Sequence, residues 1–123
     1  MVTRVVVDAA NVIGSRPDGW WRDRPGAARR FAERVRTTVV ARRLETPVIL
    51  VLEGSARAGA AEEDVGGVQV VHASGSGDDA IVALADTTDH VVVVTADRLL
   101  AARVRAMDAD VVGPGWLLDR LVD

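Results

Sequence analysis

Short runs of valine and other apolar residues alternate along this chain with segments in which apolar residues recur every three or four positions. Runs that are apolar at consecutive positions are typical of strands buried on both faces, and the segments between them predict helices. The alternation therefore predicts an α/β fold: a three-layer α/β/α sandwich with a mainly parallel sheet of about five strands and right-handed crossovers.

The apolar runs and the helical periodicity also place the expected elements. We expect strands at residues 4–7, 48–52, 68–73, 91–95 and 110–112. We expect helices after Pro25 and at residues 79–85, 98–106 and 116–122, with a short helix at most in the glycine-rich segment 54–67. At 123 residues the chain is long enough for one core and too short for two ordinary domains, so we expect one domain over residues 1–123.

Composition limits the chemistry that this chain can perform. It has no cysteine, which excludes a disulfide, a thiol nucleophile and a thiolate metal site. All 15 basic residues are arginine, which excludes a lysine Schiff base and a Walker phosphate loop. Any metal must be held by oxygen ligands or by one of the two histidines, which favours a hard cation such as Mg²⁺ or Mn²⁺.

Nothing in the sequence predicts a membrane protein. No apolar stretch approaches the ~20 residues that span a bilayer. Residues 1–4 lead directly into an expected strand, without the basic, apolar and small-residue regions of a secretory signal. We therefore expect a cytoplasmic location and no membrane partner.

Acidic residues follow three of the expected strands. Asp8 closes the first apolar run, Glu53 follows the second, and Asp97 closes the run that begins at residue 91. The carboxyl ends of parallel strands share the rim of the sheet where such folds bind ligands, and side chains on neighbouring strands start about 5 Å apart. Carboxylates gathered there predict a divalent-metal site. A metal so placed activates water and stabilises a leaving oxygen, which is the chemistry of phosphodiester hydrolysis.

Three short motifs carry a resemblance to a known family. They are Asp8-Ala9-Ala10-Asn11-Val12-Ile13-Gly14, Asp78-Asp79-Ala80-Ile81 and Val94-Thr95-Ala96-Asp97. Together with the order of elements along almost the whole chain, they resemble the acidic motifs of NYN-domain nucleases, which belong to the PIN-like fold. The pair Ala9-Ala10 departs from the bulkier or glycine-containing pair that is usual in the family.

The resemblance implies a role for each matched residue. Asp8 would be the central metal ligand, and Asn11 would orient it or contact the substrate. Asp78 and Asp97 would be further ligands, with Asp79 as a helper. Glu53 stands where relatives often carry aspartate. The implied activity is cleavage of RNA with Mg²⁺ or Mn²⁺.

Each of these residues also has a structural alternative. Asp78 and Asp97 precede expected helices, where aspartate caps exposed N–H groups. Asp8 would be paired with a nearby arginine or with Asn11 if it held no metal, Asn11 is a common turn residue, and Glu53 would be an ordinary surface acid. His72 and His90 lack a spaced partner for a metal or a catalytic base, so we interpret both as structural.

Positive charge is concentrated in one part of the chain. Between Arg16 and Arg43, nine arginines stand against three acids, a local charge of +6, whereas the remainder carries −9. Such asymmetry indicates polyanion binding, with a solvated helix face as the alternative. We expect four arginines to contact the RNA backbone: Arg16, Arg22, Arg24 and Arg98.

Two tryptophans, Trp20 and Trp21, lie between the first strand and the first expected helix. Exposed tryptophan beside arginine stacks on nucleobases. The alternatives are a hydrophobic plug at the sheet edge or a contact between two copies of the chain in a homodimer.

The leading hypothesis is a metal-dependent ribonuclease that uses no side-chain nucleophile. The alternative is a catalytically weak or inactive nuclease-like domain that binds RNA or a protein partner. A receiver domain is disfavoured because its late lysine is absent, and a Rossmann unit because Asp8-Ala9-Ala10-Asn11 stands where a glycine-rich loop should follow the first strand.

Overall fold

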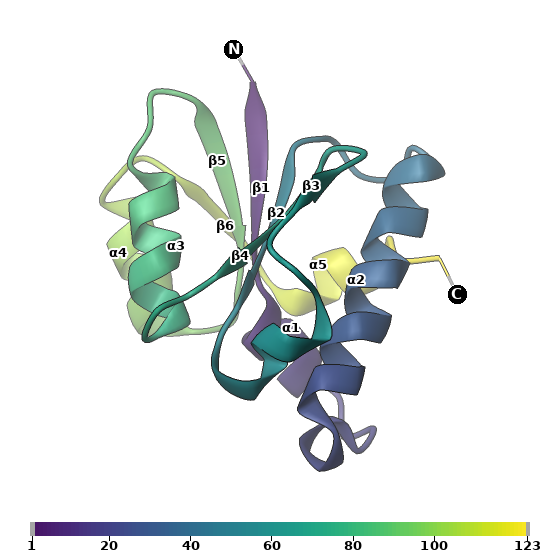
Figure 1. Ribbon diagram of the computed structural model, residues 1–123. Helices are drawn as coiled ribbons and strands as arrows, with labels where there is room; N and C mark the ends of the chain where they lie inside the picture. Colours follow the sequence, from purple (N-terminus) through teal and green to yellow (C-terminus); the bar gives the residue numbers. More distant parts are fainter. Residues whose placement is uncertain (1, 123) are drawn as a thin grey trace.

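The computed structural model describes residues 2–122 and contains a six-stranded sheet in the order β3-β4-β2-β1-β5-β6 (Figure 1). The strands are β1 (Thr3–Asp8), β2 (Val48–Leu52), β3 (Asp64–Val65), β4 (Val68–His72), β5 (His90–Val94) and β6 (Asp110–Val112). All neighbours pair in parallel except β3 and β4, which are antiparallel. β1 lies between β2 and β5, with Val7 opposite Leu50 on one side and Val94 on the other.

Helices cover both faces of this sheet. The α-helices are α1 (Ala9–Gly14), α2 (Arg24–Val40), α3 (Gly77–Ala85), α4 (Arg98–Arg105) and α5 (Pro114–Leu118), and the 3-10 turns are η1 (Trp20–Arg22) and η2 (Gly54–Gly59). In Figure 1, α3 and α4 lie on one side of the sheet and α2 and α5 on the other. The predicted three-layer α/β/α arrangement is confirmed. Among the described helices, none is long and apolar enough to cross a membrane.

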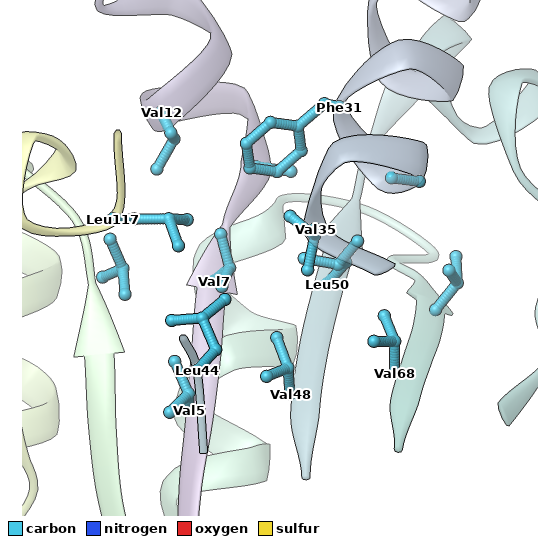
Figure 2. Packing of buried hydrophobic residues seen from close by; sticks show 14 of the residues in the cluster. Val5, Val7, Val12, Phe31, Val35, Leu44, Val48, Leu50, Val68 and Leu117 are labelled. Carbon is cyan, nitrogen blue, oxygen red and sulfur yellow. The ribbon is translucent and has the colours of Figure 1, made fainter. Parts of the chain in front are cut away.

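The core is divided by the sheet into two clusters, because successive side chains of a strand point to opposite faces. Val5 and Val7 pack with residues of α1, α2 and α5, and Figure 2 shows this cluster with Phe31 of α2 close to Val12 of α1. Val6 packs on the opposite face with residues of α3 and α4. All five residues of β2 are buried, which explains why its sequence is apolar at every position rather than at alternate ones.

Two elements of the structure are not among the strands and helices expected from the sequence. The first is α1, which has six residues and is too short to show a helical period; it starts at once because Asp8 itself is its N-cap. The second is the two-residue strand β3, which folds back on β4 through Gly66 and Gly67. Both glycines have positive φ (61° and 85°), as tight hairpin turns require.

The remaining boundaries differ by small shifts. The last helix spans Pro114–Leu118 rather than 116–122, because proline is preorganised for the first turn. The helix expected at 79–85 begins at Gly77, after a serine cap. Helix α2 begins one residue before Pro25 and is capped by Asp23, whose side chain accepts from the Gly26 N–H.

Candidate active site

Asp8 lies at the carboxyl end of β1 and is buried, with 7% of its surface exposed. Its Oδ2 accepts a hydrogen bond from the Thr95 hydroxyl (2.9 Å), and its Oδ1 accepts from the Asn11 N–H (3.4 Å). Burial raises the pKa of Asp8, the two hydrogen bonds oppose that shift, and the charges of Asp78 and Glu53 add to it. A buried carboxylate is thus held in place by two partners, while further acids act on it electrostatically.

Thr95 connects Asp8 to Asp97. Its side chain is almost fully buried, donates to Asp8, and accepts a hydrogen bond from the Asp97 N–H (3.1 Å). The link exists because β1 and β5 are neighbouring strands. Sequence reasoning assigned no role to Thr95, although a hydroxyl closing a run of four valines was a signal.

Asn11 ties the first turn of α1 to the segment between β5 and α4. Its side-chain oxygen accepts a hydrogen bond from the Ala96 N–H (2.8 Å), while its own N–H donates to Asp8. The expected role in orienting Asp8 is therefore exerted through the backbone. The side chain also holds the loop that carries Asp97.

Asp97 caps α4, as the structural alternative predicted. Its Oδ1 accepts hydrogen bonds from the N–H groups of Leu99 (2.9 Å) and Leu100 (3.1 Å). The residue is half-buried, and after burial its charge is the largest factor that raises the pKa of Asp78. Asp97 can therefore cap α4 and also act on the neighbouring acids, because only one of its two carboxylate oxygens accepts hydrogen bonds from the helix.

Glu53 and Asp78 meet at the N-terminus of α3. Glu53 Oε2 accepts a hydrogen bond from the Gly77 N–H (2.6 Å), which attaches the end of β2 to the first residue of α3. The pKa of Asp78 is raised by burial, then by Asp97 and Glu53, and is lowered by Arg103. We define the acidic pocket as Asp8, Glu53, Asp78 and Asp97, because the charges of Glu53 and Asp78 act on Asp8 and those of Asp97 and Glu53 act on Asp78.

Asp79 is the predicted ligand that is directed elsewhere. Its side chain is 77% exposed and forms an ion pair with Arg103 of α4 (3.0 Å). Its influence on the pKa of Asp78 is the smallest of the neighbouring charges, and it does not contribute to that of Asp8. The structure thus assigns Asp79 an interhelical ion pair.

The donor set fits a hard cation that keeps part of its water shell. The four side chains offer only carboxylate oxygens, and an ion of this class is commonly held by one or two carboxylates together with water. Across residues 2–122, no three acidic or histidine side chains stand close enough to enclose one ion by themselves. The four side chains therefore do not form a closed structural metal site.

The four arginines expected to hold RNA occupy different surroundings. Arg98 is exposed at the first position of α4, directly after Asp97. Arg16 lines a cleft between α1 and α2. Arg22 lies over the ring of Trp21 (5.9 Å to the centroid) and Arg24 over that of Trp20 (5.2 Å). Only Arg98 is adjacent in sequence to a member of the acidic pocket.

Both histidines have structural partners at the sheet, in agreement with their interpretation from the sequence. The His72 Nε2 donates to the Ala60 carbonyl (2.6 Å). The His90 Nε2 lies 2.7 Å from an Asp110 carboxylate oxygen. The two residues bind neighbouring segments to the edges of their strands.

The fold and the site define a class: an α/β domain of PIN-like fold with carboxylates at the carboxyl rim of its sheet. The chain belongs to the DUF188 family, described as the uncharacterized BCR, YaiI/YqxD family, which it matches over residues 32–115. That match includes Glu53, Asp78 and Asp97 and leaves Asp8 outside.

Among solved structures, the chain is similar to a crystal structure of Rae1 (YacP) from Bacillus subtilis, in its W164L mutant. The two share 20% sequence identity with a TM-score of 0.73, over 97% of this chain and 74% of that one. At this identity the likeness supports the PIN-like fold alone. No curated protein sequence matches the chain.

Proposed function

We propose that this chain is a metal-dependent ribonuclease of the NYN type that hydrolyses RNA phosphodiester bonds. The observation that carries the proposal is the acidic pocket, in which burial and the charges of neighbouring acids raise the pKa of Asp8 and of Asp78 at the rim where α/β sheets bind ligands. Carboxylates gathered in this way repel one another, and a divalent cation relieves that repulsion.

The residues of the pocket divide the work. Asp8 and Asp78 would hold a largely hydrated Mg²⁺ or Mn²⁺, and Asp97 would add negative charge beside Asp78. Thr95 and Asn11 keep Asp8 in one orientation, and Glu53 fixes the N-terminus of α3 and hence the backbone of Asp78. Asp79 would assist the site only by adding negative charge near Asp78.

A cation bound there lowers the pKa of a coordinated water and stabilises charge on the leaving oxygen. The attacking oxygen would come from water, so the chain needs no side-chain nucleophile. Arg98 lies next to Asp97 and would pair with a phosphate of the RNA, with Arg16, Arg22 and Arg24 contacting the strand further away. The site would thus operate in the cytoplasm on RNA as substrate.

The test compares cleavage of mixed RNAs by the parent chain and by Asp8→Asn during a Mn²⁺ titration. We expect the parent to cleave in a manner that EDTA abolishes, and Asp8→Asn to lose at least about a hundredfold in rate, since the variant weakens the metal site. Asp86→Asn, an exposed acid at the end of α3, is the matched control and should cleave like the parent.

The second candidate is a nuclease-like domain that binds RNA or a protein without cutting. It is favoured by one observation, that no three acids within the described residues enclose a single ion. Affinity of the parent for RNA without product at any Mn²⁺ concentration would select this candidate. Equal cleavage by parent and Asp8→Asn would show that the acidic pocket is not the active site.

A further inference from the structure

A cleft of about 300 Å³ opens between α1, α2 and α5, outside the acidic pocket. Its floor is apolar and its walls carry charge. It is lined by Val12, Ile13, Arg16, Asp18, Ala27, Arg30, Phe31, Arg34 and Leu118. We propose that this cleft binds one nucleotide of the RNA strand next to the bond that is cut, an inference that rests on the proposed function.

The charges of the cleft match a phosphate. Three arginines, Arg16, Arg30 and Arg34, line the cleft against the single carboxylate of Asp18. The Nε of Arg34 donates to the Val122 carbonyl (3.3 Å), so we assign phosphate contacts to Arg16 and Arg30. In the described part of the chain, Arg16 and Arg30 take part in no ion pair. Asp18 is engaged locally, because its Oδ1 accepts a hydrogen bond from the Trp20 N–H (3.3 Å). Planar guanidinium groups bind phosphate oxygens in pairs, so this wall suits an RNA backbone.

The floor of the cleft suits the apolar part of the same nucleotide. Figure 2 shows the ring of Phe31 next to Val12, both in the core that underlies the cleft. Ile13 and Leu118 are partly buried and pack on the same cluster. The volume is at the small end of the usual range for ligand sites, which favours one nucleotide unit over a larger ligand.

The position of the cleft connects it to the acidic pocket. Helix α1 begins immediately after Asp8, and Val12 and Ile13 of that helix line the cleft, about 6–8 Å further along its axis. Figure 1 shows α1 and the first turns of α2 at the same end of the molecule, where β1 ends. A strand with one phosphate at Asp8 therefore places a neighbouring nucleotide at this cleft.

Arg30 and Arg29 provide a matched pair for the test. Both are exposed neighbours on α2 with the same charge, but only Arg30 lines the cleft. The experiment measures binding of a short fluorescein-labelled oligouridylate by anisotropy in EDTA, so that neither cleavage nor metal is needed. Thermal melts of each variant establish that it is folded.

We expect Arg30→Ala to weaken oligouridylate binding about tenfold and to lower the slope of log K against log salt by about 0.7, the effect of one lost phosphate contact on a single strand. Arg29→Ala should weaken binding by less than about twofold, as is usual for an exposed charge. Uridine monophosphate should compete at higher concentration, and its inhibition constant should rise in Arg30→Ala.

Several results would overturn the inference. Equal losses in Arg29→Ala and Arg30→Ala would show a diffuse attraction to the basic helix, and binding of the monophosphate as tightly as the oligonucleotide would show a pocket for free nucleotides. Absence of oligouridylate binding by the parent would also refute it. Cleavage is measured separately, with Mn²⁺ and the Asp8→Asn variant. If Arg30→Ala binds oligouridylate as tightly as the parent while the parent cleaves RNA, the inference about the cleft is refuted and the proposed function is not.

Discussion

Thr95 shows how one small polar residue organises the acidic pocket. Among residues 2–122, its hydroxyl is the only side-chain group that forms a hydrogen bond with the Asp8 side chain. The same hydroxyl oxygen accepts a hydrogen bond from the Asp97 N–H. Both partners belong to the proposed metal site, yet Thr95 itself is not an expected ligand. Thr95 therefore orients Asp8 without itself supplying an oxygen to the proposed metal site.

We predict that Thr95→Val reduces Mn²⁺-dependent cleavage about ten- to a hundredfold, because Asp8 loses the hydroxyl that orients it. The variant should also unfold more easily, since the carboxylate of Asp8 stays buried with one hydrogen bond fewer, a loss of about 1–3 kcal/mol. Thr95→Ser keeps the hydroxyl and should retain most of the activity. Cleavage rates and urea unfolding measure the two effects, and equal activity of the valine and serine variants would contradict this role.

The elements of this fold differ in how well the sequence predicts them. The strand β2 is evident because five consecutive buried residues leave a continuous apolar run. Helix α1 and strand β3 are invisible to periodicity because they have six and two residues, and their existence depends on a cap at Asp8 and a glycine turn. The pattern of strands thus predicts the layers, whereas these two short elements depend on a local cap and a local turn that leave no periodic signal.

The same limit applies to the candidate site. Apolar patterning predicts the two strands that end near Asp8 and Asp97, whereas the proximity of these residues follows from the pairing of β1 with β5, which the structure supplies. The pairing of Asp79 with Arg103 is not predicted either, because it depends on how α3 packs beside α4. Asp78 and Asp79 therefore have different surroundings although they are adjacent in the sequence, and a sequence motif alone does not distinguish them.

The two tryptophans of the turn η1 differ in their surroundings. Trp20 is half-buried, lies over the end of α1 near Gly14, and contacts the ring of Trp21 edge to face at 5.8 Å. Trp21 remains 48% exposed, with Arg22 beside it. Trp20 therefore packs on the end of α1, and Trp21 presents an aromatic surface within the basic part of the chain.

We predict that Trp21→Ala weakens binding of single-stranded RNA by about 1–3 kcal/mol, the usual contribution of one stacked base, and that Trp21→Phe retains most of the affinity. Anisotropy measurements in EDTA test this without cleavage. Light scattering at increasing protein concentration tests the homodimer alternative. A dimer of the parent that Trp21→Ala converts to a monomer, with unchanged RNA affinity, would assign the exposed ring to self-association.

At the scale of the whole molecule, the acidic pocket is expected to lower stability. Burial and neighbouring acids raise the folded-state pKa of Asp8 and Asp78 above their ordinary value of 3.8. A carboxyl with a raised pKa binds its proton more tightly in the folded state. The free energy of unfolding therefore falls as pH rises from the ordinary value through the raised one, and the full penalty is present at neutral pH.

Asp8→Asn removes that penalty, because the amide cannot ionise. Its oxygen can still accept from the Asn11 N–H, and its NH₂ can donate to the Thr95 oxygen in place of the bond that Thr95 donates to the carboxylate. We predict that its Tm exceeds that of the parent at pH 7.5 and that the difference shrinks toward pH 4. Calorimetry at both pH values measures it. A variant less stable than the parent at pH 7.5, or a difference that grows on acidification, would contradict the prediction.

Addition of Mn²⁺ then links this instability to the proposed function. A cation that binds only the folded state raises the free energy of unfolding by about 2.7 kcal/mol at a hundred times its Kd. The parent should gain Tm with Mn²⁺ at pH 7.5 and gain less near pH 4, because protonated carboxyls are poor ligands. Asp8→Asn should respond weakly at both. The stability that the apo protein lacks because of its acidic pocket would thus be recovered on metal binding, whereas an equal response of parent and variant would place the ion outside this pocket.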